Sequence, residues 1–366
     1  MTHPYETLPP DRFWRSAVAD CDPMAITGLW QPKFAIKPRR RIVTAGSCFA
    51  QHFSRALRDR GYRWTDFEPG PSTLTDDQRR DYNYGIFSFR TGNIYTPRML
   101  WQWLSWAFGT LPEPQEVWES QGRFYDPFRP AIEPGGFASA DELFASRAVT
   151  LAALRLAVEN AHVFTFTMGL TESWQSAETG LEYAVCPGTV AGRFDPARHL
   201  FVNHRFGALA ADLDAAIALM RRLNPRLQVL LTVSPVPLTA TACGEHVLSA
   251  TSRSKSLLRA VAAERVADDP LTDYFPSYEI ITHPVWQGRF FAPNQRSVRP
   301  EGVAFVMENF FRDQAAAYGI APTPALAATP PSREIEQDSV SAADLRCEEE
   351  ILAAFAPPHD DGRATP

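Results

Sequence analysis

The sequence predicts an α/β fold, a three-layer αβα sandwich with a mostly parallel central sheet. Short apolar stretches with the character of buried strands alternate with segments of helical length and periodicity. This alternation is typical of a parallel sheet that is covered by helices on both faces. The clearest strands cover residues 42–45, 163–168 and 227–233.

Each of these three strands ends at small or polar residues: Gly46-Ser47, Gly169 and Ser234. The carboxyl ends of parallel strands meet at one edge of a sheet, and open α/β sheets bind their ligands there. We therefore expect the functional site at this edge.

The remaining elements follow from apolar periodicity and from glycine and proline punctuation. Helices are predicted at 49–60, 100–108, 141–160, 209–223, 252–266 and 301–317, and further strands at 62–67 and 278–282.

The chain organisation predicts one main domain with two flanking segments. Residues 1–40 are rich in proline and aromatic residues and suit an arm packed on the domain. The domain covers 41–320, with an insertion around 68–140. Residues 321–366 form a tail of Pro, Ala and acidic residues. A capping-box pattern predicts a short helix at 342–355, which either docks on the domain or a partner protein or is disordered.

Composition excludes several classes of function. A chain of 366 residues with 45% hydrophobic residues can bury a core, and a net charge of −6 does not suit a nucleic-acid surface. The five cysteines have no metal-ligand spacing, so we expect free thiols, no metal and no cofactor. No apolar run is long enough for a membrane span and the N-terminus has no signal-peptide pattern, so a cytoplasmic location is expected.

Ser47 lies where the first strand breaks at Gly46 and runs into a helix. A serine at a helix N-terminus is often only an N-cap. It also suits a nucleophile, because the free N–H groups of the first helical turn stabilise a developing oxyanion. Cys48 beside it is a further nucleophile or, alternatively, a small buried hydrophobe.

Several segments carry a resemblance to a known family. The pentapeptide Gly46-Ser-Cys-Phe-Ala50 resembles the signature of the GSCFA family, which belongs with the SGNH, or GDSL-like, hydrolases. The segments 84–87, 166–174, 232–241, 254–256 and 274–280 are similar to members of this family as well. The resemblance covers about residues 4–317 and implies an SGNH-type, flavodoxin-like sandwich.

The resemblance also implies site residues. In SGNH hydrolases a Ser, a Gly N–H, an Asn amide and an Asp-x-x-His block form the site. Ser47 matches the first block and Gly85 the second. Thr171 stands where the Asn is expected, and Glu172 follows it. In the fourth block no histidine has an Asp three residues before it, and Arg299 stands where His is expected. Arginine cannot act as a base at physiological pH.

The base must therefore come from elsewhere, or the chain has none. His246 lies in the loop after the strand that ends at Val233. His283 follows the predicted strand 278–282 and would emerge at the Ser47 edge. Lys255 is a further candidate if it loses its proton.

These residues lead to three functional hypotheses. The first is an SGNH-like serine esterase or deacetylase that uses Ser47 on an O-acylated saccharide or similar ester, so the partner is a small-molecule or glycan ester. The second is an O-acyltransferase acting on a glycan. The third is a non-catalytic binding or scaffold protein in which Arg296 and Arg299 contact an anionic group.

Overall fold

The computed structural model describes residues 3–320 and 348–356, and its centre is a four-stranded parallel sheet. Neighbouring strands align their carboxyl ends, because Gly46 pairs with Thr167 and Met168 pairs with Val233. The strand order is β1 (Ile42–Gly46), β4 (Val163–Met168), β8 (Gln228–Val233) and β9 (Thr272–Tyr274).

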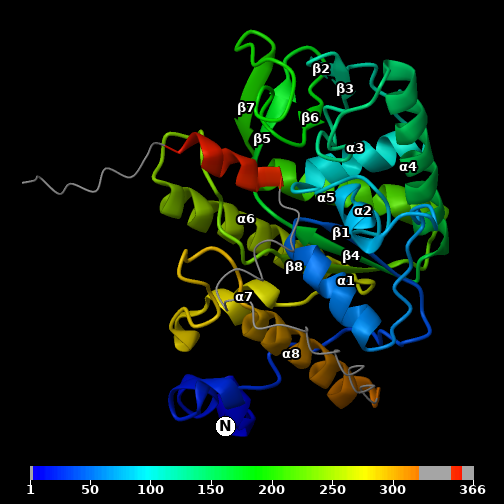
Figure 1. The fold of residues 1–366 in the computed structure, drawn as a ribbon. Coiled ribbons are helices and arrows are strands. Elements are labelled where there is room, and N and C mark those ends of the chain that lie inside the picture. Colours follow the sequence, from blue (N-terminus) through cyan, green and yellow to red (C-terminus); the bar gives the residue numbers. More distant parts are fainter. Residues whose placement is uncertain (1–2, 321–347, 357–366) are drawn as a thin grey trace, which may run out of the picture.

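Helices cover both faces of this sheet, which confirms the predicted αβα sandwich (Figure 1). One face carries α1 (Phe49–Asp59), α7 (Ser277–Thr282) and α8 (Pro300–Tyr318). The other carries α3 (Pro97–Ala107), α4 (Ala140–Asn160), α5 (Phe206–Leu223) and α6 (Val247–Asp268). A short helix, α2 (Asp76–Asp81), lies outside these layers.

The strand sequences explain the two cores. Side chains alternate between the faces of a strand. Val43 and Ala45 of β1 pack with α3 to α6, whereas Ile42 packs with α1 and α8. In β8, Leu231 likewise packs with α3 to α6, whereas Leu230 packs with α1 and α8. Both faces are therefore apolar, as strands buried on two sides require.

Two small antiparallel sheets, which the sequence analysis did not predict, extend the domain beside the main sheet (Figure 1). One has the order β6-β5-β7 and starts directly after β4. Their bounds are β5 (Glu172–Ser176), β6 (Glu182–Tyr183), β7 (His199–Asn203), β2 (Trp118–Ser120) and β3 (Arg123–Tyr125).

Two predicted strands are wrong. Residues 278–282 lie in helix α7, where Ser277, Ile280 and Ile281 are buried at helical spacing. The fourth strand position is taken by β9, which ends two residues before Pro276. Residues 62–67 form only an isolated parallel bridge, between Trp64 and Ile42, because Ser88 takes over the bonding to β1 at Thr44.

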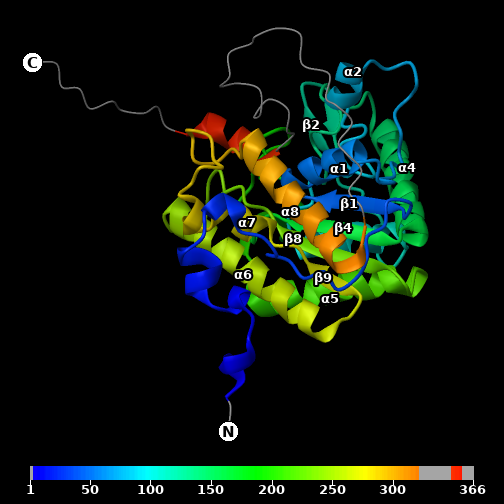
Figure 2. The ribbon, with the colours of Figure 1, turned by 90° about the horizontal axis from the view of Figure 1, so that it is seen from below.

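The flanking segments differ in packing. Trp30, Phe34 and Ile36 are buried in the core beside α8, whereas most residues of 3–25 are exposed and extend from the body (Figure 2). This first part forms the short turns η1 (Pro4–Thr7), η2 (Pro10–Arg12), η3 (Arg15–Ala19) and η4 (Pro23–Ala25). A further turn, η5 (Pro284–Trp286), follows α7.

Of the predicted tail helix at 342–355, the first residues lie outside the described part of the chain. The rest is a 3₁₀ helix, η6 (Glu348–Phe355). No helix in the described ranges is long and apolar enough to cross a membrane.

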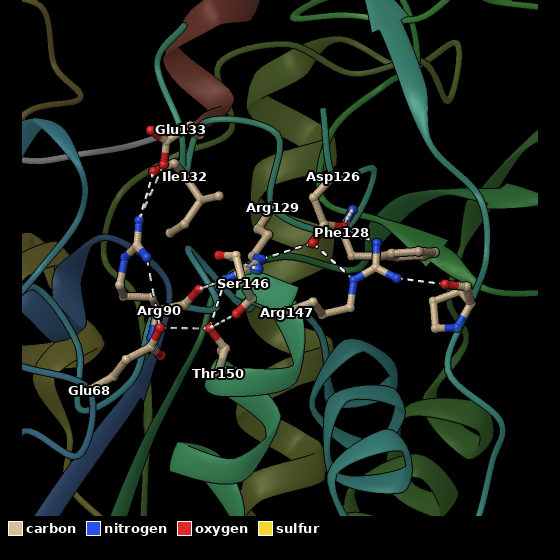
Figure 3. A network of polar contacts seen from close by, with 11 residues as sticks. Glu68, Arg90, Asp126, Phe128, Arg129, Ile132, Glu133, Ser146, Arg147 and Thr150 are labelled. Carbon is tan, nitrogen blue, oxygen red and sulfur yellow. Dashed lines mark hydrogen bonds and ion pairs between the residues drawn. The ribbon is translucent and has the colours of Figure 1, made fainter. Parts of the chain in front are cut away.

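Buried charges hold the 68–140 region against α4 (Figure 3). Asp126 accepts hydrogen bonds from Arg129 Nε at 2.8 Å and Arg147 Nη2 at 2.7 Å, and all three side chains are fully buried. Burial alone would raise the pKa of Asp126, but the two guanidiniums outweigh burial and hold the pKa below its usual range. A second group joins Glu68, which accepts from the Arg90 backbone N–H and from Thr150 Oγ1, at 2.8 Å each. These buried charge pairs add to the packing of α3 in the core and tie the loops of this region to α4.

Candidate functional site at the carboxyl edge of the sheet

The turn that carries Ser47 depends on glycine. Gly46 has φ +133°, and a Cβ there would stand 2.3 Å from Thr167 O of the neighbouring strand. The Ser47 N–H donates to the same carbonyl at 2.9 Å, and α1 begins two residues later. Only glycine allows this close approach of β1 to β4 at the strand end.

The Ser47 hydroxyl is buried and has no hydrogen-bond partner among the described residues. The side chain is 2% exposed. It does not cap α1, since Cys48 occupies the N-cap position and no side chain caps that helix. A buried hydroxyl without a partner costs about 1–3 kcal/mol. Other buried side-chain atoms of the described residues lack a partner as well, among them Thr165 Oγ1 and Thr167 Oγ1 of β4, so what distinguishes Ser47 is its place in the turn between β1 and α1.

Gly169, at the end of β4, links Ser47 to two other residues. A Cβ on Gly169 would lie 3.1 Å from Ser47 Cβ and 2.8 Å from Tyr95 Cδ1, so a side chain there would displace one of them. The Gly169 N–H donates to Tyr95 O at 2.8 Å. The Gly169 carbonyl accepts a hydrogen bond from Lys255 Nζ, and Lys255 is 2% exposed. Ser47 and Lys255 thus both lie next to Gly169.

Thr171 and Glu172 lie beside this cluster with their polar groups engaged. The Thr171 hydroxyl donates to Asn203 Oδ1 at 2.8 Å, and its N–H donates to Ser254 Oγ at 2.9 Å. Glu172 Oε1 accepts from Thr241 Oγ1 at 2.7 Å. Because the Thr171 proton is directed at Asn203, Thr171 does not occupy an oxyanion-donor geometry in this state.

The predicted histidines lie apart from Ser47, with which neither forms a hydrogen bond. His246 is exposed, and its Nδ1 caps α6 by accepting the Leu248 N–H. His283 caps η5 through Val285, and its ring contacts Trp14 and Trp286. His283 was expected at the Ser47 edge because a strand was predicted before it. Those residues form helix α7, so this argument does not hold.

The other sequence candidates occupy neighbouring positions. Gly85 has φ +69°, and the residues after it, Ile86 and Phe87, pack on Ala50 of α1. Arg299 is the exposed N-cap residue of α8 and forms no side-chain capping bond. Cys48 is buried.

A cavity of about 600 Å³ lies next to the cluster. Tyr95 and Leu170 contribute to its wall, and Glu172 and Ser173 contribute from β5, but Ser47 does not. Ser47 is therefore not part of the cavity wall.

A second polar group reaches the cavity through Ser173. Glu182 is fully buried and accepts hydrogen bonds from Ser173 Oγ at 2.9 Å, Thr96 Oγ1 at 2.5 Å and His204 Nε2. Burial would raise the pKa of Glu182, but these hydrogen bonds, chiefly that from His204, hold the pKa below its usual value.

This group is not a catalytic triad. Ser173 and Glu182 both contact Nε2 of His204, whereas a triad histidine uses one ring nitrogen for the acid and the other for the serine. The group instead joins β5, β6 and β7 to α3.

Sequence reasoning missed Tyr95, Asn203 and Thr241. None of the three lies in a chemical motif, and each reaches the site only through tertiary packing. Two signals were available: Asn203 and Thr241 lie near the ends of segments that lead into helices α5 and α6, and Thr241 is the last residue of the family-like segment 232–241. Within the described ranges, no group of three or more His, Cys, Asp or Glu side chains is placed to hold a metal ion.

Comparison with known proteins gives one match. The model of the GSCFA family matches residues 41–310, which include β1, the Ser47 turn and most of α8. No curated protein and no solved structure matches the chain.

Proposed function

Because this chain belongs to the GSCFA family, whose match includes the Ser47 turn, we propose that it is an SGNH-like serine hydrolase that cleaves O-acyl esters through Ser47. The observation that supports this most is the buried, unpartnered Ser47 hydroxyl at the carboxyl edge of the sheet. A purely structural serine at a helix start would cap the helix, and this one does not.

Lys255 is the base that we infer, and like the two histidines it forms no hydrogen bond with Ser47 Oγ in this structure, so proton transfer needs the local movement described below. It is buried, and its Nζ is bonded to the carbonyl of Gly169, the glycine beside Ser47 Cβ. A lysine acts as a general base only in its neutral form, which desolvation favours. The neutral amine takes the Ser47 proton as Oγ attacks the ester carbonyl.

The remaining steps use the start of α1. The tetrahedral oxyanion forms near the N-terminus of α1, whose dipole stabilises negative charge. The N–H groups of Ser47, Ala50 and Gln51 are not donors to it, since they are bonded to the carbonyls of Thr167, Ser47 and Cys48. The C–O bond then breaks, the alcohol leaves with the proton from Lys255, and water hydrolyses the acyl-enzyme by the reverse sequence. An O-acylated saccharide is the substrate class that the family resemblance suggests.

Access to Ser47 requires a local movement. Since the hydroxyl is enclosed, the segment around Tyr95 and Leu170 must shift before an ester carbonyl reaches Oγ. Enzymes often complete their site through such motions when substrate binds.

Hydrolysis of p-nitrophenyl acetate and octanoate by the full chain tests the proposal. Ser47→Ala should abolish turnover, and Lys255→Met should lower kcat by about 10²–10⁴, the usual contribution of a general base. Lys255→Arg should not restore activity, because arginine stays protonated. If Lys255 serves only to bind the Gly169 carbonyl, Lys255→Arg should recover part of the rate.

His246→Ala is the matched control. It removes a helix cap at a cost of about 1 kcal/mol and should leave kcat unchanged. Turnover that survives Ser47→Ala in a folded variant would contradict the proposal. Turnover lost with His246→Ala would move the base to that histidine.

A further inference from the structure

The cavity beside Ser47 has the character of a site for an apolar group. Its wall is mostly aliphatic and aromatic, and it draws on four regions of the chain. Representative members are Met99 of α3, Trp174 and Phe201 of the small sheet, and Leu238 of the loop after β8. Concave sites with such walls and few polar groups are typical of small-molecule binding.

The polar groups in the wall are few, and two of them remain neutral. Burial and the nearby Glu116 raise the pKa of Tyr183, and burial raises the pKa of Cys186 to about 11. Glu172 is the only carboxylate among the described lining residues, and it faces Thr241 at one end. A negatively charged ligand would be repelled by this carboxylate, and no lysine or arginine among the described lining residues would offset the repulsion.

The C-terminal segment completes the wall. Leu352, Ala353, Phe355 and Ala356 of the η6 region line the cavity, and Figure 1 shows this red segment beside β5. An ion pair holds it there, with Arg296 Nη1 at 3.1 Å from Glu350 Oε1. Arg296 Nε also donates to Pro237 O at 3.2 Å, in the loop after β8 that contributes Leu238 to the wall.

We propose that this cavity binds the acyl chain of a neutral, medium-chain ester and that the η6 segment is part of the binding wall. At about 30 Å³ for each water-sized group, a cavity of about 600 Å³ holds roughly twenty non-hydrogen atoms, so a chain of about ten carbons fits. The assignment of the ligand as an ester rests on the proposed function. The assignment of the site as an acyl-chain site rests on the wall alone.

Calorimetric titration of the Ser47→Ala full chain with the N-methyl amides of hexanoic, octanoic and decanoic acid tests the inference. These probes are neutral and resist an esterase. Affinity should rise about fourfold per methylene, or roughly fifteenfold per two-carbon step. Decanoate should bind more weakly than the decanoic amide, and Glu172→Gln should reduce that difference.

Two matched leucine variants separate the wall from the rest of the surface. Leu352→Glu places a charge in the wall and should weaken binding of the decanoic amide at least tenfold. Leu248→Glu changes an exposed leucine of α6 that does not line the cavity, and it should leave the affinity unchanged. Both positions are surface-accessible, so neither variant should alter the melting temperature of the domain by much.

Affinity that is independent of chain length would overturn the inference. Equal effects of Leu352→Glu and Leu248→Glu on the affinity would overturn it as well. Tighter binding of N-acetylglucosamine than of the decanoic amide would also overturn it. The titration uses the Ser47→Ala variant, which should not hydrolyse esters. Its outcome therefore reports on binding alone and does not depend on the proposed reaction. If affinity depends on chain length but the wild type has no esterase activity, the acyl-chain site is supported and the proposed hydrolysis is contradicted. If the wild type hydrolyses esters but affinity does not depend on chain length, the hydrolysis is supported and the acyl-chain site is contradicted.

Discussion

At the scale of single residues, Ser47 is held between two glycines. Gly46 lets β1 reach the Thr167 carbonyl, and Gly169 leaves just enough room for Ser47 Cβ. The backbone therefore fixes Cβ, and only rotation about the Cα–Cβ bond changes where the hydroxyl points. Such fixed positioning is what a nucleophile needs, because small displacements cost large factors in rate.

Gly46→Ala should destabilise the protein by at least about 3 kcal/mol, measured by urea unfolding. The new Cβ would combine an unfavourable φ with a 2.3 Å approach to a backbone oxygen of β4, which cannot move without breaking the sheet.

Gly61→Ala is the control for backbone conformation alone. Gly61 has φ +70°, and no atom lies within 4 Å of the position of an added Cβ. This variant should cost about 1–2 kcal/mol. Equal costs for the two variants would show that the contact with Thr167 does not restrict position 46.

The sequence predicted the strand-to-helix turn around Ser47 but not the surroundings of the candidate bases, for physical reasons. The strand-glycine-serine-helix pattern is local, so its geometry can be derived from the chain itself. A base must reach Ser47 through tertiary packing, which sequence position alone does not determine. His246 precedes a helix, and its ring caps that helix instead.

At the scale of elements, residues 278–282 were predicted as a strand but lie in helix α7, which shows that a short segment does not reveal its secondary structure. Its tyrosine and isoleucines suit a strand by propensity. Burial at Ser277, Ile280 and Ile281, however, follows helical spacing, and β9 had already ended at Tyr274. A segment of six residues is too short to distinguish the helical period from the strand period, whereas α4 and α5 are long enough for the helical period to be recognised.

The region at 68–140 depends on the Asp126 charge cluster, which composition could not indicate. Asp126→Asn should destabilise the protein by about 3–5 kcal/mol, because Arg129 and Arg147 would stay fully buried without their counter-charge. Urea unfolding at neutral pH measures this.

Glu159→Gln provides the comparison on α4. It breaks the exposed Arg155–Glu159 pair, with its 2.9 Å distance, and should cost less than about 1 kcal/mol. A small cost for Asp126→Asn as well would mean that the buried arginines find other acceptors.

At the scale of the whole molecule, the parallel sheet gathers residues from distant parts of the chain. β1 brings Ser47, β4 brings Gly169 and α6 brings Lys255. The sequence predicted this shared edge, because parallel pairing alone determines which strand ends meet. It did not predict the cavity, since the β5–β7 sheet, the loop after β8 and the η6 segment form it only by packing together.

The central claim is that Ser47 is an activated nucleophile. The most direct measurement is reaction of the full chain with a fluorophosphonate probe, followed by mass spectrometry of the labelled peptide. The account predicts a single adduct on Ser47, which is absent from Ser47→Ala. Labelling should also decrease in Lys255→Met, since the serine would lose its base.

An adduct on Ser173 would contradict the account, since it would assign the chemistry to the group around His204 and Glu182. A folded wild-type protein that takes up no probe would contradict it as well, and the Ser47 edge would then be a binding site without hydrolytic chemistry.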